Sequence, residues 1–183
     1  VTRKDSFLFF LIFSKGFLRL FLISIPLLPV LILYKTNLMS NHFAKELIFS
    51  FLFKGMHKDK FNKLSKNFVE YKLDKIINSR AMEKIKWHKT KNHKVVLVSA
   101  SIENYLFYWC RKNHIELIGT QVELVDSFLT GKFKSKNCYG AEKVSRIKNK
   151  YDLKKVKTIY AYGDSKGDYE MIELADFKYL NHF

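Results

Sequence analysis

The second half of the chain alternates short strand-like runs with helical segments, starting at the β-branched run Val95–Val98. In chain order, the pattern predicts a strand at Val95–Val98, a helix at Ile102–Asn113, a strand at Ile115–Thr120, a helix at Ala141–Asn149, a strand at Val156–Tyr162 and a helix at Asp168–Ala175. A hairpin turn is expected at Thr130–Lys132, after a strand over Val122–Phe128. Strands that alternate with helices favour an α/β fold built on a parallel sheet.

The first half of the chain has a helical pattern instead. Apolar residues recur every three or four positions from Leu38 to about Lys86, and Gly55 separates two such runs. With 183 residues, 48% of them hydrophobic, the chain is long enough for one domain with a modest insertion. A doubly wound sheet usually begins with a strand, but Val1–Phe7 is too short and too charged to form it.

Near the start of the chain, Phe7–Tyr34 is intensely apolar, with two basic residues as its only charges. A membrane-spanning helix needs about 20 apolar residues. The longest uncharged run, Leu20–Tyr34, is shorter and contains Pro26 and Pro29. A buried helical hairpin is the first interpretation, with the prolines at a bend or at the turn between two helices. A membrane-surface or re-entrant segment is the second, and a secretion signal the third.

The formal net charge of +16 raises the question of a polyanionic partner. The lysine-rich stretch 53–94 also carries four acidic residues, and no helix-turn-helix, zinc-finger or RNA-recognition signature accompanies it. We therefore expect no nucleic-acid partner, and peripheral membrane contact stays open. The two cysteines, Cys110 and Cys138, form no CxxC pair, which fits a reduced cytoplasmic protein.

The loop after the last predicted strand is the richest in reactive groups, with the sequence Gly163-Asp164-Ser165-Lys166-Gly167-Asp168. In parallel α/β sheets, ligands bind just beyond the carboxyl ends of the strands. Two carboxylates at a strand-to-helix turn suit an oxygen-liganded cation such as Mg²⁺. The alternative is that Asp168 only caps a helix and Asp164 is a turn residue.

Two further segments carry groups suited to phosphate. Ser99 and Ala100 follow the first predicted strand, where a helix N-terminus offers unpaired N–H groups. Lys143 lies in the first turn of a predicted helix, where a cation opposes the helix dipole. Each has a simpler interpretation, as a capping serine and as one lysine among many.

Taken together and in this order, these segments resemble motifs of the haloacid dehalogenase (HAD) superfamily of phosphatases. Within it, the chain is similar to subfamily IB, which includes phosphoserine phosphatase. The segments that carry the resemblance are Val95–Ser99 for the second motif, Lys143 within Cys138–Val144 for the third, Gly163–Asp168 with Met171 for the fourth, and the turn Leu129–Phe133. The resemblance covers the chain from about residue 94 to its end.

The resemblance implies a Rossmannoid parallel sheet with an inserted helical cap and an Mg²⁺-dependent phosphatase that acts through an aspartyl-phosphate on a small phosphorylated substrate. Ser99 and Ala100 would bind the phosphoryl group, and Lys143 would neutralise its charge. Asp164 would bind Mg²⁺, and Asp168 would position the site. Such roles are physically reasonable, because phosphoryl transfer depends mainly on positioning and charge stabilisation.

The chain departs from the family pattern at the first motif, Asp-x-Asp-x-Thr, because it contains no DxD sequence. Asp5 is no substitute, since no strand precedes it. We expect the missing strand and nucleophile just before Val1. Residues 1–6 would then follow that motif, 7–88 would form the cap and 89–183 the α/β core. The alternatives are a catalytically inactive relative, or a protein that binds membranes or nucleic acid through its basic, apolar surface.

Overall fold

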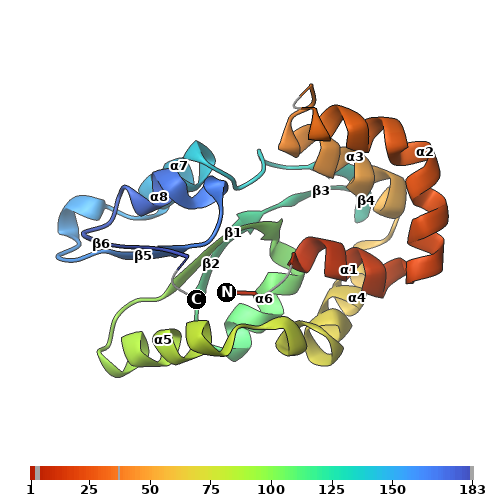
Figure 1. Cartoon of the computed structure of the whole chain (residues 1–183). Coiled ribbons are helices and arrows are strands. Elements are labelled where there is room, and N and C mark those ends of the chain that lie inside the picture. Colours follow the sequence, from red (N-terminus) through yellow and green to blue (C-terminus); the bar gives the residue numbers. More distant parts are fainter. Residues whose placement is uncertain (3–4, 37, 182–183) are drawn as a thin grey trace.

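The computed structural model describes residues 1–2, 5–36 and 38–181, with the side chains at positions 19, 23, 24, 26, 27 and 31 outside that description. The first half forms α1 (Ser6–Lys15), α2 (Phe17–Lys35), α3 (Asn41–Phe53), α4 (Lys58–Tyr71), the 3-10 helix η1 (Leu73–Ile76) and α5 (Ser79–Thr90). The second half forms β1 (Val96–Ile102), α6 (Glu103–Lys112), β2 (Glu116–Thr120), β3 (Val122–Val125), β4 (Phe128–Phe133), α7 (Ala141–Lys150), η2 (Leu153–Lys155), β5 (Tyr160–Gly163), η3 (Lys166–Asp168), α8 (Tyr169–Ile172) and β6 (Phe177–Leu180). In Figure 1, α1–α4 lie on one side of the molecule, β1 and β2 cross its middle, and β5 and β6 lie on the other side with α7 and α8.

The first helix begins and ends at clear local signals. The carboxylate of Asp5 accepts hydrogen bonds from the backbone N–H groups of Phe7 (2.8 Å) and Leu8 (3.1 Å). These N–H groups have no partner within the helix, so the aspartate caps α1. The helix ends at Gly16, whose φ of +80° favours glycine, and α2 starts at the next residue.

Of the two positions predicted for the prolines, a bend or the turn between two helices, the turn is wrong. The two helices meet at Gly16, and both prolines lie within α2. For Pro26 this statement concerns the backbone, because the structure does not describe its side chain. A proline removes one helical hydrogen bond and bends a helix that tertiary contacts maintain. Figure 1 shows α2 curving along its length, which agrees with the other expectation, a bend.

An aromatic core joins the helical half to α6. The ring of Phe10 lies 4.9–5.7 Å, centroid to centroid, from those of Phe53, Phe61, Phe68 and Tyr105. All five side chains are at most 1% exposed. Burying one such side chain contributes about 1.5–3 kcal/mol. This core fixes α1, α3 and α4 against a helix of the second half.

The second apolar helix is buried much less than the first. Phe7, Phe10 and Leu11 of α1 are buried, whereas the described apolar side chains of α2 are mostly exposed. α2 contacts α1 and α3. The prediction of a buried hairpin therefore holds for α1 and is wrong for the outer face of α2. Within the described part of the chain, no helix combines the length and apolarity needed to cross a membrane.

The predicted parallel strands form two separate pairs. β1 pairs with β2, placing Val96 opposite Glu116, and β5 pairs with β6, placing Tyr160 opposite Phe177. Among the described residues, β1 and β5 each have a strand partner on one edge only. β5 starts later than predicted, the helix after it is shorter, and β6 was not predicted.

The antiparallel hairpin of β3 and β4 turns at a different place from the one predicted. Its turn residues are Asp126 and Ser127, which both have positive φ angles, whereas Thr130–Lys132 lies inside β4. Gly131 is required for another reason. A Cβ atom there would lie 2.9 Å from the Cα of Ser50, so the glycine allows α3 to lie close to β4.

Candidate functional site

The segment predicted to bind phosphate belongs to β1, and this corrects the prediction that it opens a helix. β1 runs to Ile102, and α6 starts only at Glu103. The pairing with β2 is irregular between Val98 and Ile102, so Ser99 and Ala100 lie in a bulge of the strand. The Ser99 hydroxyl accepts a hydrogen bond from the backbone N–H of Ser101 at 3.1 Å, and it caps no helix.

A buried ion pair joins the third and fourth motifs. Lys143 lies in the first turn of α7, as predicted, and its Nζ donates to Asp168 Oδ1 at 2.5 Å and to the carbonyl of Val98 at 3.1 Å. The two side chains of the pair are only 7% and 8% exposed. The lysine thus connects β1 to the loop after β5.

Asp168 also organises its own loop. Its Oδ2 accepts hydrogen bonds from the backbone N–H groups of Asp164 (3.2 Å) and Ser165 (3.1 Å) and from the Ser165 hydroxyl (2.6 Å). Burial alone would raise the pKa of Asp168, but the Lys143 ammonium and these hydrogen bonds outweigh burial and hold the pKa below its usual value. Asp168 is therefore an ionised anchor, which is more than the simple helix cap considered above.

The loop requires glycine where the strand ends. A Cβ atom on Gly163 would lie 2.5 Å from the Cβ of Asp168 and 2.9 Å from the Cδ1 of Ile172. Gly167 packs against the ring of Tyr139, which leaves no room for a side chain there. These two contacts explain why the motif has glycine at both positions.

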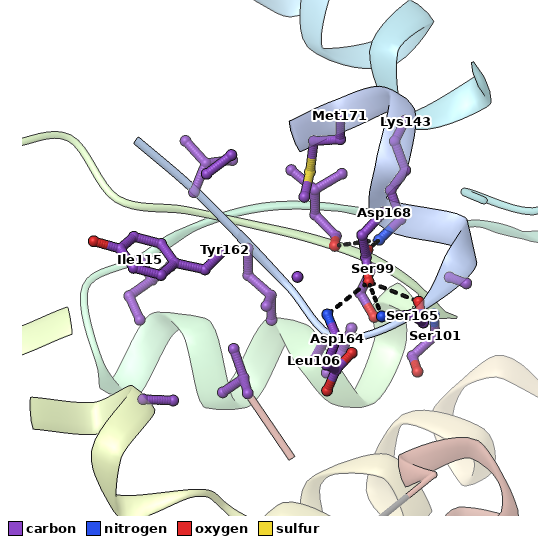
Figure 2. Close-up of a pocket in the computed structure, with 18 of the residues that line it drawn as sticks. Ser99, Ser101, Leu106, Ile115, Lys143, Tyr162, Asp164, Ser165, Asp168 and Met171 are labelled. Carbon is purple, nitrogen blue, oxygen red and sulfur yellow. Dashed lines mark hydrogen bonds and ion pairs between the residues drawn. The ribbon is translucent and has the colours of Figure 1, made fainter. Parts of the chain in front are cut away.

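Asp164 is the exposed carboxylate of the loop, whereas Asp168 is buried. It lines the same cavity as Ser99, Ala100, Lys143 and Asp168, and Figure 2 shows the labelled members of this group together on one side of that cavity. Because Asp168 already binds Lys143 and Ser165, Asp164 is the carboxylate of this loop that remains available to a cation. No cluster of three or more His, Cys, Asp or Glu suited to a metal occurs among the described residues. By themselves, the side chains present do not complete a magnesium site.

The cavity has a volume of about 1220 Å³ and lies between the two parallel strand pairs. Its walls include Val95–Ser101 along β1 and Thr158–Ser165 along β5. Like the other described strands, β1 and β5 each have a strand partner on one edge only. The cavity therefore separates β1 from β5, and both strands lie beside the group formed by Ser99, Lys143, Asp164 and Asp168.

The start of the described chain reaches this cavity. The carbonyl of Val1 accepts a hydrogen bond from Asn78 N–H at 2.8 Å, and Val1 is part of the cavity lining.

Lys45 is a residue of the cavity that the sequence analysis missed. It projects from α3, donates to the carbonyl of Ala100 at 2.6 Å and lies 4.6 Å from the ring centroid of Phe7. Burial lowers the pKa of Lys45 to about 8, although the nearby Asp5 raises it. It is one of 33 Lys and Arg residues and belongs to no motif, so only its hydrogen bond to β1 identifies it.

Comparison with known proteins identifies the class that this arrangement defines. The model of the haloacid dehalogenase-like hydrolase family matches residues 1–173. The chain belongs to this family, and its α/β fold is the HAD-like fold, as the sequence resemblance implied.

Two individual proteins illustrate the relationship. Protein CicA of Caulobacter vibrioides (strain NA1000 / CB15N) is 29% identical over 180 residues, covering 97% of this chain and 80% of the relative. A protein of unknown function from Bordetella pertussis Tohama I has a structure that superposes with a TM-score of 0.74 at 16% identity, covering 85% of this chain and 80% of that one.

A third similar structure is a probable phosphoserine phosphatase from Vibrio cholerae. It superposes with a TM-score of 0.63 at 14% identity, covering 81% of this chain and 45% of that chain. At such identities these two structures show the fold alone, and the family match shows that the chain is a hydrolase-family member.

Proposed function

We propose that the protein is a phosphomonoester hydrolase of the cytoplasm that acts through an aspartyl-phosphate intermediate. The observation that carries the proposal is the convergence of Ser99, Lys143, Asp164 and Asp168 on one cavity from three separate segments of the chain. The description of the Vibrio cholerae structure as a probable phosphoserine phosphatase supports the same reaction class.

Each of these residues has a role that its contacts support. The Ser99 hydroxyl and the bulged backbone at Ala100 bind the phosphoryl oxygens. Lys143 neutralises the charge that develops on those oxygens, and Asp168 holds the Lys143 ammonium in position at 2.5 Å. Fixed charges in a buried site stabilise phosphoryl transfer more strongly than mobile ones in water.

The nucleophile is an aspartate on a strand that precedes Val1 and fills the cavity between β1 and β5. Two observations support this part of the proposal: both strands face the cavity with an edge that lacks a strand partner among the described residues, and Val1 lies at the cavity wall. The nucleophilic carboxylate would attack phosphorus and displace the substrate's alkoxide. A second aspartate, two residues further on, would protonate that leaving group and then activate the water that releases inorganic phosphate.

Mg²⁺ is the cofactor that we propose for this reaction. Mg²⁺ typically binds one or two protein carboxylates and completes its octahedral shell with water and substrate phosphate. Asp164 would supply one carboxylate, and the proposed nucleophilic aspartate would supply the other. When bound, the cation would neutralise part of the phosphate charge.

Phosphate release from p-nitrophenyl phosphate, with and without Mg²⁺, tests the proposal. We expect no turnover by the 183-residue chain, and Mg²⁺-dependent turnover by a longer chain that includes the preceding codons. Asp164→Asn should reduce that turnover to background. The matched control Asp126→Asn, in the β3–β4 turn, should leave it unchanged.

Two results would contradict the proposal. Turnover by the 183-residue chain that does not depend on Asp164 would place the chemistry elsewhere. Preceding codons that encode no strand with an aspartate pair would favour the catalytically inactive alternative.

A further inference from the structure

An exposed apolar stripe runs along α2. Its members recur at spacings of three and four residues and are each 50–73% exposed: Leu18, Leu22, Ile25, Leu28 and Ile32. This spacing places them on one face of the helix. Scattered exposed leucines are ordinary, but a continuous apolar stripe marks a surface that binds something.

The rest of the molecule supports α2 from behind. Leu20 packs against the main hydrophobic core, and α2 contacts α1 and α3. Figure 1 shows α2 along the outer edge of the molecule, with α1 and α3 on its inner side. The helix therefore presents its stripe outward, while Leu20 packs inward.

The charged residues next to the stripe in the sequence are all of one sign. No Asp or Glu occurs between Ser6 and Lys45, whereas three basic residues, Lys15, Arg19 and Lys35, do. Lys15, whose ammonium lies 4.9 Å from the ring centroid of Phe53, ends α1 just before the stripe begins, and the exposed Lys35 ends α2 just after it. An apolar stripe flanked by cations is the pattern of a helix that lies in the interface of an anionic bilayer, because long basic side chains reach the headgroups while apolar ones enter the acyl region.

From these observations we propose that the protein docks peripherally on anionic lipid bilayers through the outer face of α2. The bilayer is favoured over a second copy of the chain, since a symmetric dimer would bring the same cations together on proteins that each carry a charge of +16. The proposal goes beyond the hydrolase function, does not depend on it, and is tested by binding alone.

Vesicle flotation in a density gradient tests the docking, because aggregated protein sinks while vesicle-bound protein rises. The probes are vesicles of phosphatidylcholine with one-quarter phosphatidylglycerol, and vesicles of phosphatidylcholine alone. We expect the chain to float with the anionic vesicles and to bind the neutral ones at least ten-fold less. Salt at 0.5 M should weaken the anionic binding at least ten-fold, because it screens the charges.

Two matched variants separate the stripe from the general charge. Leu22→Asp replaces a side chain that is 58% exposed on the stripe, and Phe107→Asp replaces one that is 50% exposed on α6. Both positions are exposed, so both variants should keep the wild-type far-UV circular dichroism. We expect Leu22→Asp to weaken anionic binding at least ten-fold and Phe107→Asp to change it less than two-fold.

Several outcomes would overturn the docking. One is that the chain does not float with anionic vesicles. Another is equal weakening by both variants, which would assign the binding to overall charge. Strong flotation with neutral vesicles at high salt would indicate deep insertion in place of surface docking. A dimer in sedimentation experiments that Leu22→Asp dissociates, without flotation, would identify a second copy as the occupant.

Discussion

Replacing Asp168 by asparagine tests whether the buried ion pair supports the fold as well as the site. The substitution keeps the size of the side chain but leaves the Lys143 ammonium buried without its counter-ion, at 7% exposure. An asparagine can keep its bonds to the Asp164 and Ser165 N–H groups only by turning its own NH₂ towards that ammonium. Removing one partner of a buried pair costs about 3–5 kcal/mol of unfolding free energy.

Thermal unfolding followed by circular dichroism measures this cost. For a chain of 150–250 residues, each kcal/mol lowers Tm by about 2–4 °C, so Asp168→Asn should lower it by roughly 6–20 °C. The control Asp164→Asn removes an exposed carboxylate four residues away, and exposed substitutions usually change stability by no more than about 0.5 kcal/mol.

A double variant completes the test. Lys143→Met in the Asp168→Asn background removes the stranded charge, so the double variant should be more stable than Asp168→Asn alone. A free energy of unfolding for Asp168→Asn within 1 kcal/mol of that of the Asp164→Asn control would refute the reasoning, because the Lys143–Asp168 ion pair would then contribute nothing net to stability.

Two predictions concern pH. The pKa of Lys45 is about 8 in the folded protein and 10.5 in the unfolded chain. Between pH 8 and 10.5 the unfolded chain therefore binds more protons than the folded protein, so Lys45 makes the free energy of unfolding rise with pH in this range. Lys45→Met should therefore be more stable than the wild type below pH 8, by about 3 kcal/mol at most. Urea titrations should show this difference in stability shrinking as the pH rises towards 10.5. A difference that stays constant with pH would contradict the prediction. Hydrogen bonds from Tyr151 and Lys150 are the chief cause that lowers the pKa of Glu116 to about 2. The stability that Glu116 contributes is therefore fully present above pH 4.5, its ordinary pKa, and is lost as the pH falls towards 2. Glu116→Gln should flatten the fall of the urea midpoint between pH 4.5 and 2, and an unchanged slope would show that these hydrogen bonds do not contribute.

Local sequence signals predicted the elements whose causes are local. The strand–helix alternation, the position of Lys143 in the first turn of its helix and the turn at Gly163–Asp168 all follow from short-range pattern and backbone chemistry. Ser99, Lys143, Asp164 and Asp168 were grouped by motif, and the structure brings them to one cavity.

The wrong predictions concern features that distant residues decide. Gly131 suggested a turn, but it is needed because Ser50 lies close to it, while the real turn is at Asp126 and Ser127. The role of Lys45 depends on its hydrogen bond to Ala100 of β1, which joins residues 55 positions apart. The exposed face of α2 has the same composition as a buried helix, so sequence alone could not separate the two.

The aromatic core around Phe10 has a consequence for how the chain comes apart. Phe10 and Phe68 lie before the expected cap boundary at residue 88, and Tyr105 lies after it, yet their rings are in contact. Neither half can lose its packing without exposing the other half's rings to water. The expected boundary between cap and core therefore divides the sequence and the roles of the two parts, but it does not divide the unfolding reaction. Hydrogen exchange should find one cooperative unfolding unit that includes residues from both sides of this boundary.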